Sequence, residues 1–369
     1  MMNKITLSLA VSLGLGFVSS VYAETTEEKV QRLEAELNAL ADTVEKESSS
    51  ASTPSRTKLG GYGELHYNNI DGADAKIDFH RFILFIGHEF NETIRFFSEF
   101  ELEHSIAGDG ENGAVELEQA YIEMDLNAKH AAKAGLFLMP VGIINETHEP
   151  PVFYGVERNP LEKNIIPATW WEAGMTLSGQ LSNAGVSYDA ALTSGLAVDA
   201  TDVNIRSGRQ KVSKATAENL ALTGRLKYTG MPGVELAGTV SVQDDITQAS
   251  GDGVNGAVLT EVHAIVNKSR FGAIAQYAAW DIDIDTAAIQ NKDKQDGYLL
   301  EGSFKVTPKL GLFARHVGWS NTAGTDKEQQ NIGVSFWPHE NVVLKADIQQ
   351  QNVAAGDGDG FNLGVGYHF

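Results

Sequence analysis

The sequence predicts an all-β protein, a transmembrane antiparallel up-and-down β-barrel of about 16 strands that follows a short N-terminal α-helical coiled coil. Three observations predict this fold. Residues 361–369 alternate apolar and polar side chains and end on an aromatic residue, as a strand with one apolar face does. Similar segments recur upstream, with short turns and long polar loops between them. The chain also begins with an export signal.

The export signal is expected to occupy residues 1–23. Lys4 precedes an apolar run over residues 7–18, and small residues lead to Ala23, after which cleavage is expected. The mature chain would then start at Glu24. No later segment approaches the run of about 20 apolar residues that a membrane helix needs, so strands are the expected means of crossing a membrane.

Residues 24–46 are predicted to form a periplasmic coiled coil. Apolar residues recur at alternating spacings of three and four, which are the a and d positions of heptads, at Val30, Leu33, Leu37, Leu40 and Val44. A helix this short needs partner chains, so we expect a homo-oligomer, most simply a trimer. The alternative is a single amphipathic helix on the protein's own surface. Residues 47–57, rich in serine and containing Pro54, are expected to form a flexible linker.

Residues 58–369 are predicted to form the barrel. Leu222 and Leu226 alternate with Thr223 and Arg225, so one face would meet lipid and the other a wet lumen. A soluble sandwich would alternate in the same way, and the lengths of the connections therefore decide. Short turns near residues 230–233, 307–309 and 338–341 interleave with long loops at 199–217, 248–256, 283–295 and 323–327, which is typical of a membrane barrel.

Aromatic residues lie near the expected strand ends. They are expected to form two girdles at the membrane interfaces and comprise Tyr62, Tyr67, Trp170, Trp171, Trp280, Trp319, Trp337 and Tyr367. The expected partners of the outer surface are outer-membrane lipid and lipopolysaccharide. The C-terminal Phe369 resembles the signal that the bacterial barrel-assembly machinery reads.

Composition argues against several functions. The chain carries 28 Lys and Arg against 49 Asp and Glu, a formal charge of -21, which argues against nucleic acid as a partner. It has no cysteine, so disulfides and thiolate ligands are excluded. Two matches to G-x-G-x-x-G, at residues 108–113 and 251–256, precede no helix and are expected to be hairpin loops. No other catalytic or cofactor motif is present, although a dispersed Ser/His/Asp site stays open. His80 and His88 would lie about 26 Å apart along a strand. We therefore predict no metal site and no cofactor.

The charged side chains expected on the lumen wall are of both signs. Arg95 shares one strand face with Glu99, Glu101 and Glu103. The other basic residues at strand positions expected to face the lumen are Arg225, Lys227, Lys305 and Lys345. A mixed lining of this kind predicts a weakly selective channel.

Residues 140–169 are the longest departure from alternation. This stretch contains five prolines and many aliphatic residues, so it is too apolar to float in water and cannot be a strand. We expect it to fold into the barrel and narrow the channel. Its candidate constriction residues are His148, Glu157, Arg158, Glu162 and Lys163. The alternative is an external lid or a contact between subunits.

Part of this stretch resembles a known family. Residues 153–158 (Phe-Tyr-Gly-Val-Glu-Arg) and 162–174 (Glu-Lys-Asn-Ile-Ile-Pro-Ala-Thr-Trp-Trp-Glu-Ala-Gly) are similar to the constriction region of the phosphate-selective porin O and porin P family. The resemblance implies a trimeric sixteen-stranded porin with an inward-folded loop. An arginine ladder and lysines line the pore in that family. The basic residues of this chain are scattered, so the resemblance does not by itself extend to phosphate selectivity, and a local anion step is expected only near Arg158.

We therefore expect an outer-membrane porin of a Gram-negative bacterium, with a periplasmic N-terminus. It would let small hydrophilic solutes or ions diffuse passively through a water-filled channel, and it would not be an enzyme. Three alternatives stay open: a phosphate- or oxyanion-selective porin, a barrel enzyme, and a non-conducting protein that tethers the cell envelope.

Overall fold

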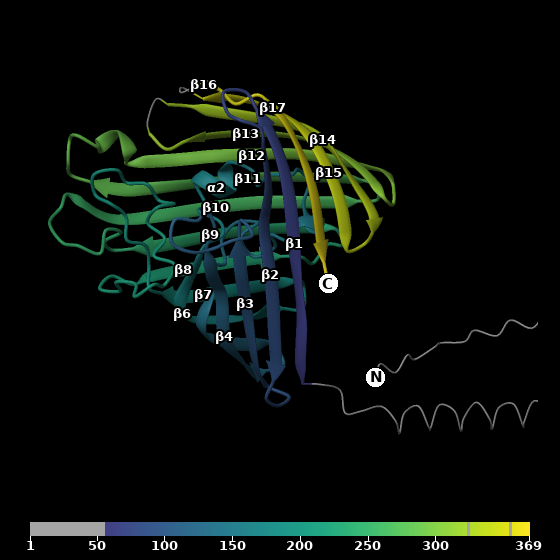
Figure 1. The fold of residues 1–369 in the computed structure, drawn as a ribbon. Helices are drawn as coiled ribbons and strands as arrows, with labels where there is room; N and C mark the ends of the chain where they lie inside the picture. The colour runs from purple at the N-terminus through teal and green to yellow at the C-terminus, as the bar shows by residue number, and fades with distance from the viewer. Residues whose placement is uncertain (1–55, 323–324, 354–355) are drawn as a thin grey trace, which may run out of the picture. The chain divides into compact units, whose positions relative to one another are not determined.

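The computed structural model describes residues 56–322, 325–353 and 356–369, which form a closed antiparallel β-barrel (Figure 1). The predicted export signal, the heptad residues Val30, Leu33, Leu37, Leu40 and Val44 and most of the linker lie outside the described residues. The strands are β1 (Thr57–Ile70), β2 (Lys76–Glu89), β3 (Ile94–Glu103), β4 (Val115–Asn127), β5 (His130–Leu138), β6 (Trp171–Ser182), β7 (Val186–Thr193), β8 (Ala221–Tyr228), β9 (Val234–Gln243), β10 (Val254–Lys268), β11 (Phe271–Ile284), β12 (Lys294–Thr307), β13 (Leu310–Ser320), β14 (Lys327–His339), β15 (Val342–Val353), β16 (Gly356–Asp357) and β17 (Gly360–His368).

The barrel closes between its first and last strands. β1 and β17 pair antiparallel from Tyr62 opposite His368 to Ile70 opposite Gly360, and Gly61 and Phe369 exchange two backbone hydrogen bonds beyond that ladder. β15 pairs directly with β17, while the two-residue β16 pairs with the end of β15. Sixteen strands therefore make up the wall, which confirms the predicted antiparallel barrel and its strand number.

Connections alternate in length around the barrel, as the sequence predicts. One end carries only short turns, at residues 90–93, 128–129, 183–185, 229–233, 269–270, 308–309 and 340–341. The other end carries the longer connections, among them residues 104–114, 139–170, 194–220, 244–253 and 285–293. Three short helices lie on these long connections: η1 (Pro150–Val152), α2 (Leu161–Asn164) and η2 (Gln290–Lys292).

Alternation along each strand separates an apolar outer face from a polar inner face. On β17, Leu363 is 45% exposed whereas its neighbour Asn362 is 1% exposed. On β8, Leu222 and Leu226 face outward while Thr223 and Arg225 are buried inside. Among the described residues, no helix is long and apolar enough to cross a membrane.

The predicted aromatic girdles are wrong for most of the residues assigned to them. Tyr62, Trp170, Trp171, Trp280 and Trp319 are all buried. Trp170, Trp280 and Trp319 belong to an apolar core that the two longest connections form inside the barrel. The indole Nε1 of Trp280, for example, donates to the carbonyl of Ile165 at 2.9 Å.

The hydrophobic core therefore lies inside the barrel. It joins the loop of residues 139–170, hereafter the internal loop, with the connection of residues 194–220 and with the inner faces of β10 to β13. From the internal loop it contains Leu161, Ile165 and Ile166, and from the 194–220 connection Leu196 and Ile205, all at most 1% exposed. Burial of these side chains contributes about 1.5–3 kcal/mol each. The core thus holds both loops against one side of the lumen.

Candidate functional site

The internal loop is closed at its base by one asparagine. The Asn145 amide donates to the carbonyls of Met139 (2.8 Å) and Trp170 (2.9 Å), and its Oδ1 accepts the Trp170 N–H at 2.6 Å. Met139 N–H also donates to Trp170 O at 2.9 Å, so the two ends of the loop are joined like paired strands. Because these groups are fully buried, leaving any of them unpaired costs about 1–3 kcal/mol.

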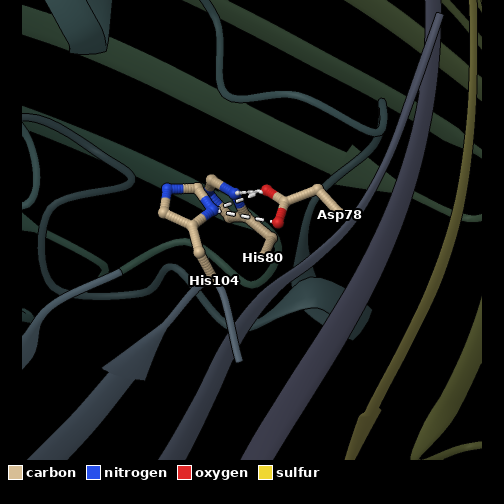
Figure 2. Close-up of side chains that lie close together, drawn as sticks. All are labelled: Asp78, His80 and His104. Carbon is tan, nitrogen blue, oxygen red and sulfur yellow. Dashed lines mark hydrogen bonds and ion pairs between the residues drawn. The ribbon is translucent and has the colours of Figure 1, made fainter. Parts of the chain in front are cut away.

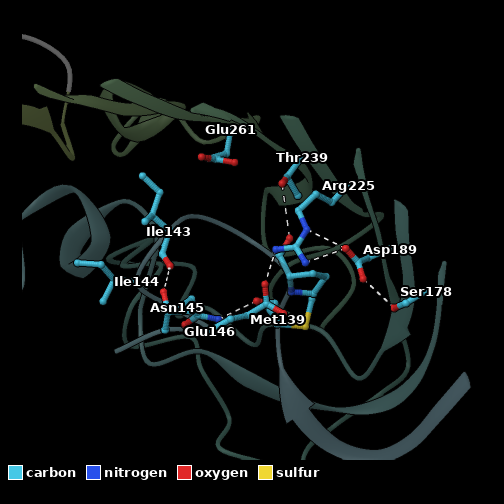
Figure 3. A network of polar contacts seen from close by, with 12 residues as sticks. Met139, Ile143, Ile144, Asn145, Glu146, Ser178, Asp189, Arg225, Thr239 and Glu261 are labelled. Atoms are coloured by element: carbon cyan, nitrogen blue, oxygen red, sulfur yellow. Dashed lines mark hydrogen bonds and ion pairs between the residues drawn. The ribbon is translucent and has the colours of Figure 1, made fainter. Parts of the chain in front are cut away.

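Arg225, predicted as a charge on the lumen wall, ties the loop to the wall. Its guanidinium binds Asp189 of β7 at 2.8 Å and also pairs with Glu146 of the internal loop (Figure 3). Asp189 in turn accepts the Ser178 hydroxyl at 2.7 Å. Two carboxylates therefore compensate Arg225, which makes it an anchor rather than a free lumen cation.

On the opposite wall, β13 and β15 clamp the middle of the loop. Arg315 donates to the carbonyl of Tyr154 at 2.5 Å and is held by Glu301 at 2.8 Å, and Lys345 donates to the carbonyl of Gly155 at 2.8 Å. Gly155 has a φ of +83°, and a Cβ there would lie 3.0 Å from the Arg315 guanidinium. Glycine is therefore required at this close approach.

Glu162, predicted as a constriction residue, is instead a buried structural acceptor. Its two carboxylate oxygens each accept a backbone N–H at 2.7 Å, from Ile143 and Ile144. Burial raises the pKa of this carboxyl, although these two hydrogen bonds oppose the shift. Glu162 is 0% exposed, so it cannot contact a solute in the channel.

His148 lies in a buried cluster of charges beneath the loop. Its Nε2 is 3.4 Å from Glu99 Oε1 on β3 and 3.4 Å from Glu118 Oε2 on β4. Burial alone would lower the pKa of His148, but the two carboxylates outweigh it and raise the pKa to about 9. A protonated His148 therefore joins the loop to the wall at neutral pH.

We expect this contact to make the stability of the protein pH-dependent. Because the folded-state pKa of about 9 lies above the ordinary value of 6.5, the stabilisation is fully present below pH 6.5 and is lost as the pH rises through about 9. His148→Gln should lower the free energy of unfolding by up to about 3 kcal/mol at pH 6 and by much less at pH 10. Thermal unfolding of the detergent-solubilised protein at both pH values measures this difference.

His316→Gln is the matched control for that measurement, because His316 contacts Tyr298 at 2.9 Å rather than the internal loop. Its effect should not change between the two pH values. A destabilisation by His148→Gln that is equally large at pH 6 and pH 10 would contradict an ionic contact.

A cavity of about 1600 Å³ lies between the internal loop and the wall. Residues of β1 to β4, β6, β13 to β15 and β17 line it, together with residues of the internal loop and of the 104–114 and 194–220 connections. Among the described residues eight basic and five acidic side chains line this cavity: Lys76, Arg81, Arg158, Lys163, Arg206, Arg209, Lys211 and Lys327, with Asp78, Glu103, Glu116, Glu118 and Glu157. The lining is thus locally basic in a chain whose formal charge is -21.

Three arginines meet where the two long connections touch. Arg158 donates to the Thr169 hydroxyl at 2.7 Å, Arg206 to the Ala168 carbonyl at 2.5 Å, and Arg209 to the carbonyls of Pro167 (3.1 Å) and Thr169. In the described part of the chain, none of the three forms an ion pair with a carboxylate. Burial, with repulsion from Arg209 and Arg158, lowers the pKa of Arg206 to about 9. Their positive charge is therefore largely uncompensated.

Arg206 and Arg209 are absent from the predicted site because the sequence predicts a long polar loop at residues 199–217. Val198, Val203 and Ile205 are at most 3% exposed, so this connection folds inward instead. The signal was present in the sequence, since apolar residues recur between the polar residues of this segment.

The remaining predicted residues occupy different places. Glu157 lines the cavity and accepts from His66 at 3.0 Å and Asn68 at 2.9 Å, while Lys163 and Glu103 also line the cavity. Glu101 is 1% exposed and lies 3.8 Å from Arg81.

Three of the predicted basic wall residues lie away from the cavity. Arg95 is held between Glu123 and Asp125 of β4, so its charge is compensated. Lys227 and Lys305 lie near the short-turn end of the barrel, on β8 and β12. None of these three lines the cavity.

Comparison with known proteins places this barrel in a family. The family model described as "Phosphate-selective porin O and P" matches residues 59–369. An uncharacterised protein of Aquifex aeolicus (strain VF5) is 30% identical over 340 residues, which cover 80% of this chain and 75% of the other.

Solved outer-membrane proteins share the fold at low sequence identity. A loop L8 deletion mutant of OmpT from Vibrio cholerae has a TM-score of 0.61 at 11% identity and covers 85% of this chain and 99% of the other. OmpT folded in vitro, in its trimer form, has a TM-score of 0.58 at 10% identity, and the match covers 85% of this chain and 99% of the other. An anion-selective porin from Comamonas acidovorans has a TM-score of 0.60 at 13% identity and covers 85% and 99%.

The family match covers the closed sixteen-stranded wall and the internal loop. The chain therefore belongs to the phosphate-selective porin O and P family, and it is an outer-membrane porin rather than an enzyme.

Proposed function

We propose that this porin prefers small anions, and that Arg158, Arg206 and Arg209 form the step at which the preference is set. The observation that carries the proposal is their meeting around residues 167–169 without a compensating carboxylate in the described part of the chain. The Nη2 of Arg158 is buried there and has no hydrogen-bond partner among the described residues. Such donors attract an anion because they are already desolvated.

Two further observations support an anion preference over the weakly selective channel expected from the sequence. The cavity lining has more basic than acidic side chains. The anion-selective porin of Comamonas acidovorans shares the fold, and the family model carries phosphate selectivity in its description. Selectivity for phosphate would be a narrower form of the proposal, because one guanidinium group can donate two parallel hydrogen bonds to two oxygens of a phosphate.

Ion substitution in a planar bilayer tests the proposal. Replacing chloride by bulky gluconate should strongly reduce the current through the purified protein, whereas replacing K⁺ by tetraethylammonium should change it little. Addition of phosphate to the chloride solution should then reduce the current if the narrower form holds. A current that depends on the cation instead would refute the anion preference.

We also propose that the protein is a trimer with a periplasmic N-terminus. β1 begins and β17 ends at the short-turn end, which is the periplasmic end of bacterial outer-membrane barrels. OmpT of Vibrio cholerae has a trimer form, and the heptads of residues 24–46 suit an assembly of three chains. Contacts with lipopolysaccharide, and recognition of Phe369 by the assembly machinery, belong to the same proposal. Native mass spectrometry of the extracted protein measures the number of chains.

A further inference from the structure

We propose that Asp78, His80 and His104 bind a divalent transition-metal ion, with Zn²⁺ as the reference ion, at the wall of the channel cavity. One carboxylate oxygen and two imidazole nitrogens lie within 4.8 Å of one another (Figure 2). All three residues line the cavity of about 1600 Å³. The site adds a ligand-binding role to a protein whose proposed function is conduction.

A β-bulge brings two of these side chains onto the lumen face. Glu64 opposes Arg81 and His66 opposes Asp78, so two steps on β1 match three steps on β2. The extra residue of β2 breaks the strict alternation, and the sequence neighbours His80 and Arg81 both line the cavity. Bulges re-aim side chains in this way and are frequent near functional sites.

His104 reaches the same place from the end of β3. Glu103, its predecessor, pairs with Arg81, and the His104 N–H donates to the carbonyl of His80 at 3.1 Å. His104 and Ser105 have φ values of +54° and +62°, a conformation that non-glycine residues rarely adopt. This turn leaves the His104 ring beside Asp78.

The spacing of the three groups suits a metal ion. His104 Nδ1 lies 2.8 Å from Asp78 Oδ2, and His80 Nδ1 lies 3.2 Å from the same oxygen. Tetrahedral ligands at Zn–N and Zn–O distances of about 2.0–2.1 Å are about 3.4 Å apart, so small side-chain movements would admit the ion. Two imidazoles with one carboxylate favour Zn²⁺, Ni²⁺ or Cu²⁺ over Mg²⁺ or Ca²⁺.

The surroundings of the site fix one ligand and leave another side open. The ring of His66 stacks on His80 at 4.8 Å and 14°, and His66 is itself held by Glu64 and Glu157, each at 3.0 Å. Neighbours of this kind orient metal-binding imidazoles. The side chain of His104 remains 34% exposed, so a bound ion would keep coordination positions open to the cavity.

Isothermal titration of the detergent-solubilised protein with ZnCl₂ tests the site. We expect one ion per chain, and at least about tenfold weaker binding in each of His80→Gln, His104→Gln and Asp78→Asn. His88→Gln is the matched control, because it lies on the same strand near the opposite end of the barrel and should leave the affinity unchanged. Heat-modifiable electrophoretic mobility shows that each variant is folded.

A second metal-capable group provides the decisive comparison. Glu99, Glu118 and His148 also lie within 4.8 Å of one another, but they are buried. Binding that is lost in His148→Gln and kept in His104→Gln would overturn the proposal, as would no binding to the unmodified protein or equal loss in His88→Gln.

Cobalt(II) absorption by the unmodified protein gives a second readout that needs no variant. Visible bands that Zn²⁺ displaces would support a site with nitrogen and oxygen ligands, whereas their absence would count against it. Neither measurement depends on current through the channel, so failure of the proposed anion preference would leave this result intact.

Discussion

Replacing Arg206 and Arg209 together by glutamine is expected to reduce the ratio of chloride to potassium permeability about tenfold. A unit charge about 8 Å from a permeating ion contributes about 1 kcal/mol at an effective dielectric constant of about 40. Loss of two such charges costs chloride about 2 kcal/mol, which screening by salt roughly halves, and potassium gains a similar amount. The permeability ratio should therefore fall by at least about tenfold. Each glutamine can keep one hydrogen bond to the carbonyls of residues 167–169, so the loop should stay in place. Reversal potentials under a KCl gradient measure the change.

The control for this pair is the double replacement of Arg206 and Arg209 by lysine. Lysine keeps the charge but loses the planar fork of donors. Selectivity should survive in the lysine variant, with at most a change in conductance. Equal selectivity in the glutamine and lysine variants would show that these charges do not set the preference.

Releasing the clamp between the wall and the internal loop is expected to give the second large effect. The double variant Arg315→Met and Lys345→Met removes the donors to the carbonyls of Tyr154 and Gly155 and leaves Glu301 buried without its cation. Breaking a buried ion pair of this kind costs about 3–5 kcal/mol. The loop segment around Gly155 should then leave its seat. Single-channel recordings should show a higher conductance and more frequent current fluctuations.

Lys227→Met is the matched control for the clamp. Lys227 lies at a lumen-facing position of β8, as Lys345 does on β15. Among the described residues, no hydrogen bond joins the Lys227 side chain to the internal loop. The Lys227→Met substitution removes a basic side chain from the wall without releasing the internal loop. A rise in conductance as large in this control as in the double variant would contradict the clamp.

Much of the barrel is predictable from sequence because alternation survives wherever one face meets lipid. Leu222, Leu226 and Leu363 face outward as predicted, and Arg225 and Asn362 face inward. The strand number follows from the length of the barrel segment and the spacing of its turns. These features depend on local patterns, so a single sequence carries them.

The inner surface is less predictable because it depends on contacts between distant segments. The bulge in β2 breaks the two-residue period, so strict alternation cannot place both His80 and Arg81 on the lumen face. His104 lies 24 positions beyond His80 and joins it only through the pairing of β2 with β3. A comparison of His80 with His88 alone could not find this cluster.

The roles of the charged residues were also hidden in the sequence. Alternation along the strands places Arg95 and Arg225 on the lumen wall. Only the folded chain brings Glu123 and Asp125 to Arg95, and Glu146 to Arg225. Two carboxylates therefore compensate the charge of each arginine. Two of the three uncompensated arginines, Arg206 and Arg209, come from the connection of residues 194–220, which packs inside the barrel against Trp280 and other apolar wall residues.

The reversal potential of the unmodified porin under a KCl gradient tests the central claim most directly. The guanidinium step of Arg158, Arg206 and Arg209 predicts a reversal potential displaced toward the equilibrium potential of chloride, with a displacement that shrinks as salt screens the charges. A reversal potential near zero, or one displaced toward the equilibrium potential of potassium, would contradict the claim that these arginines make the channel prefer anions.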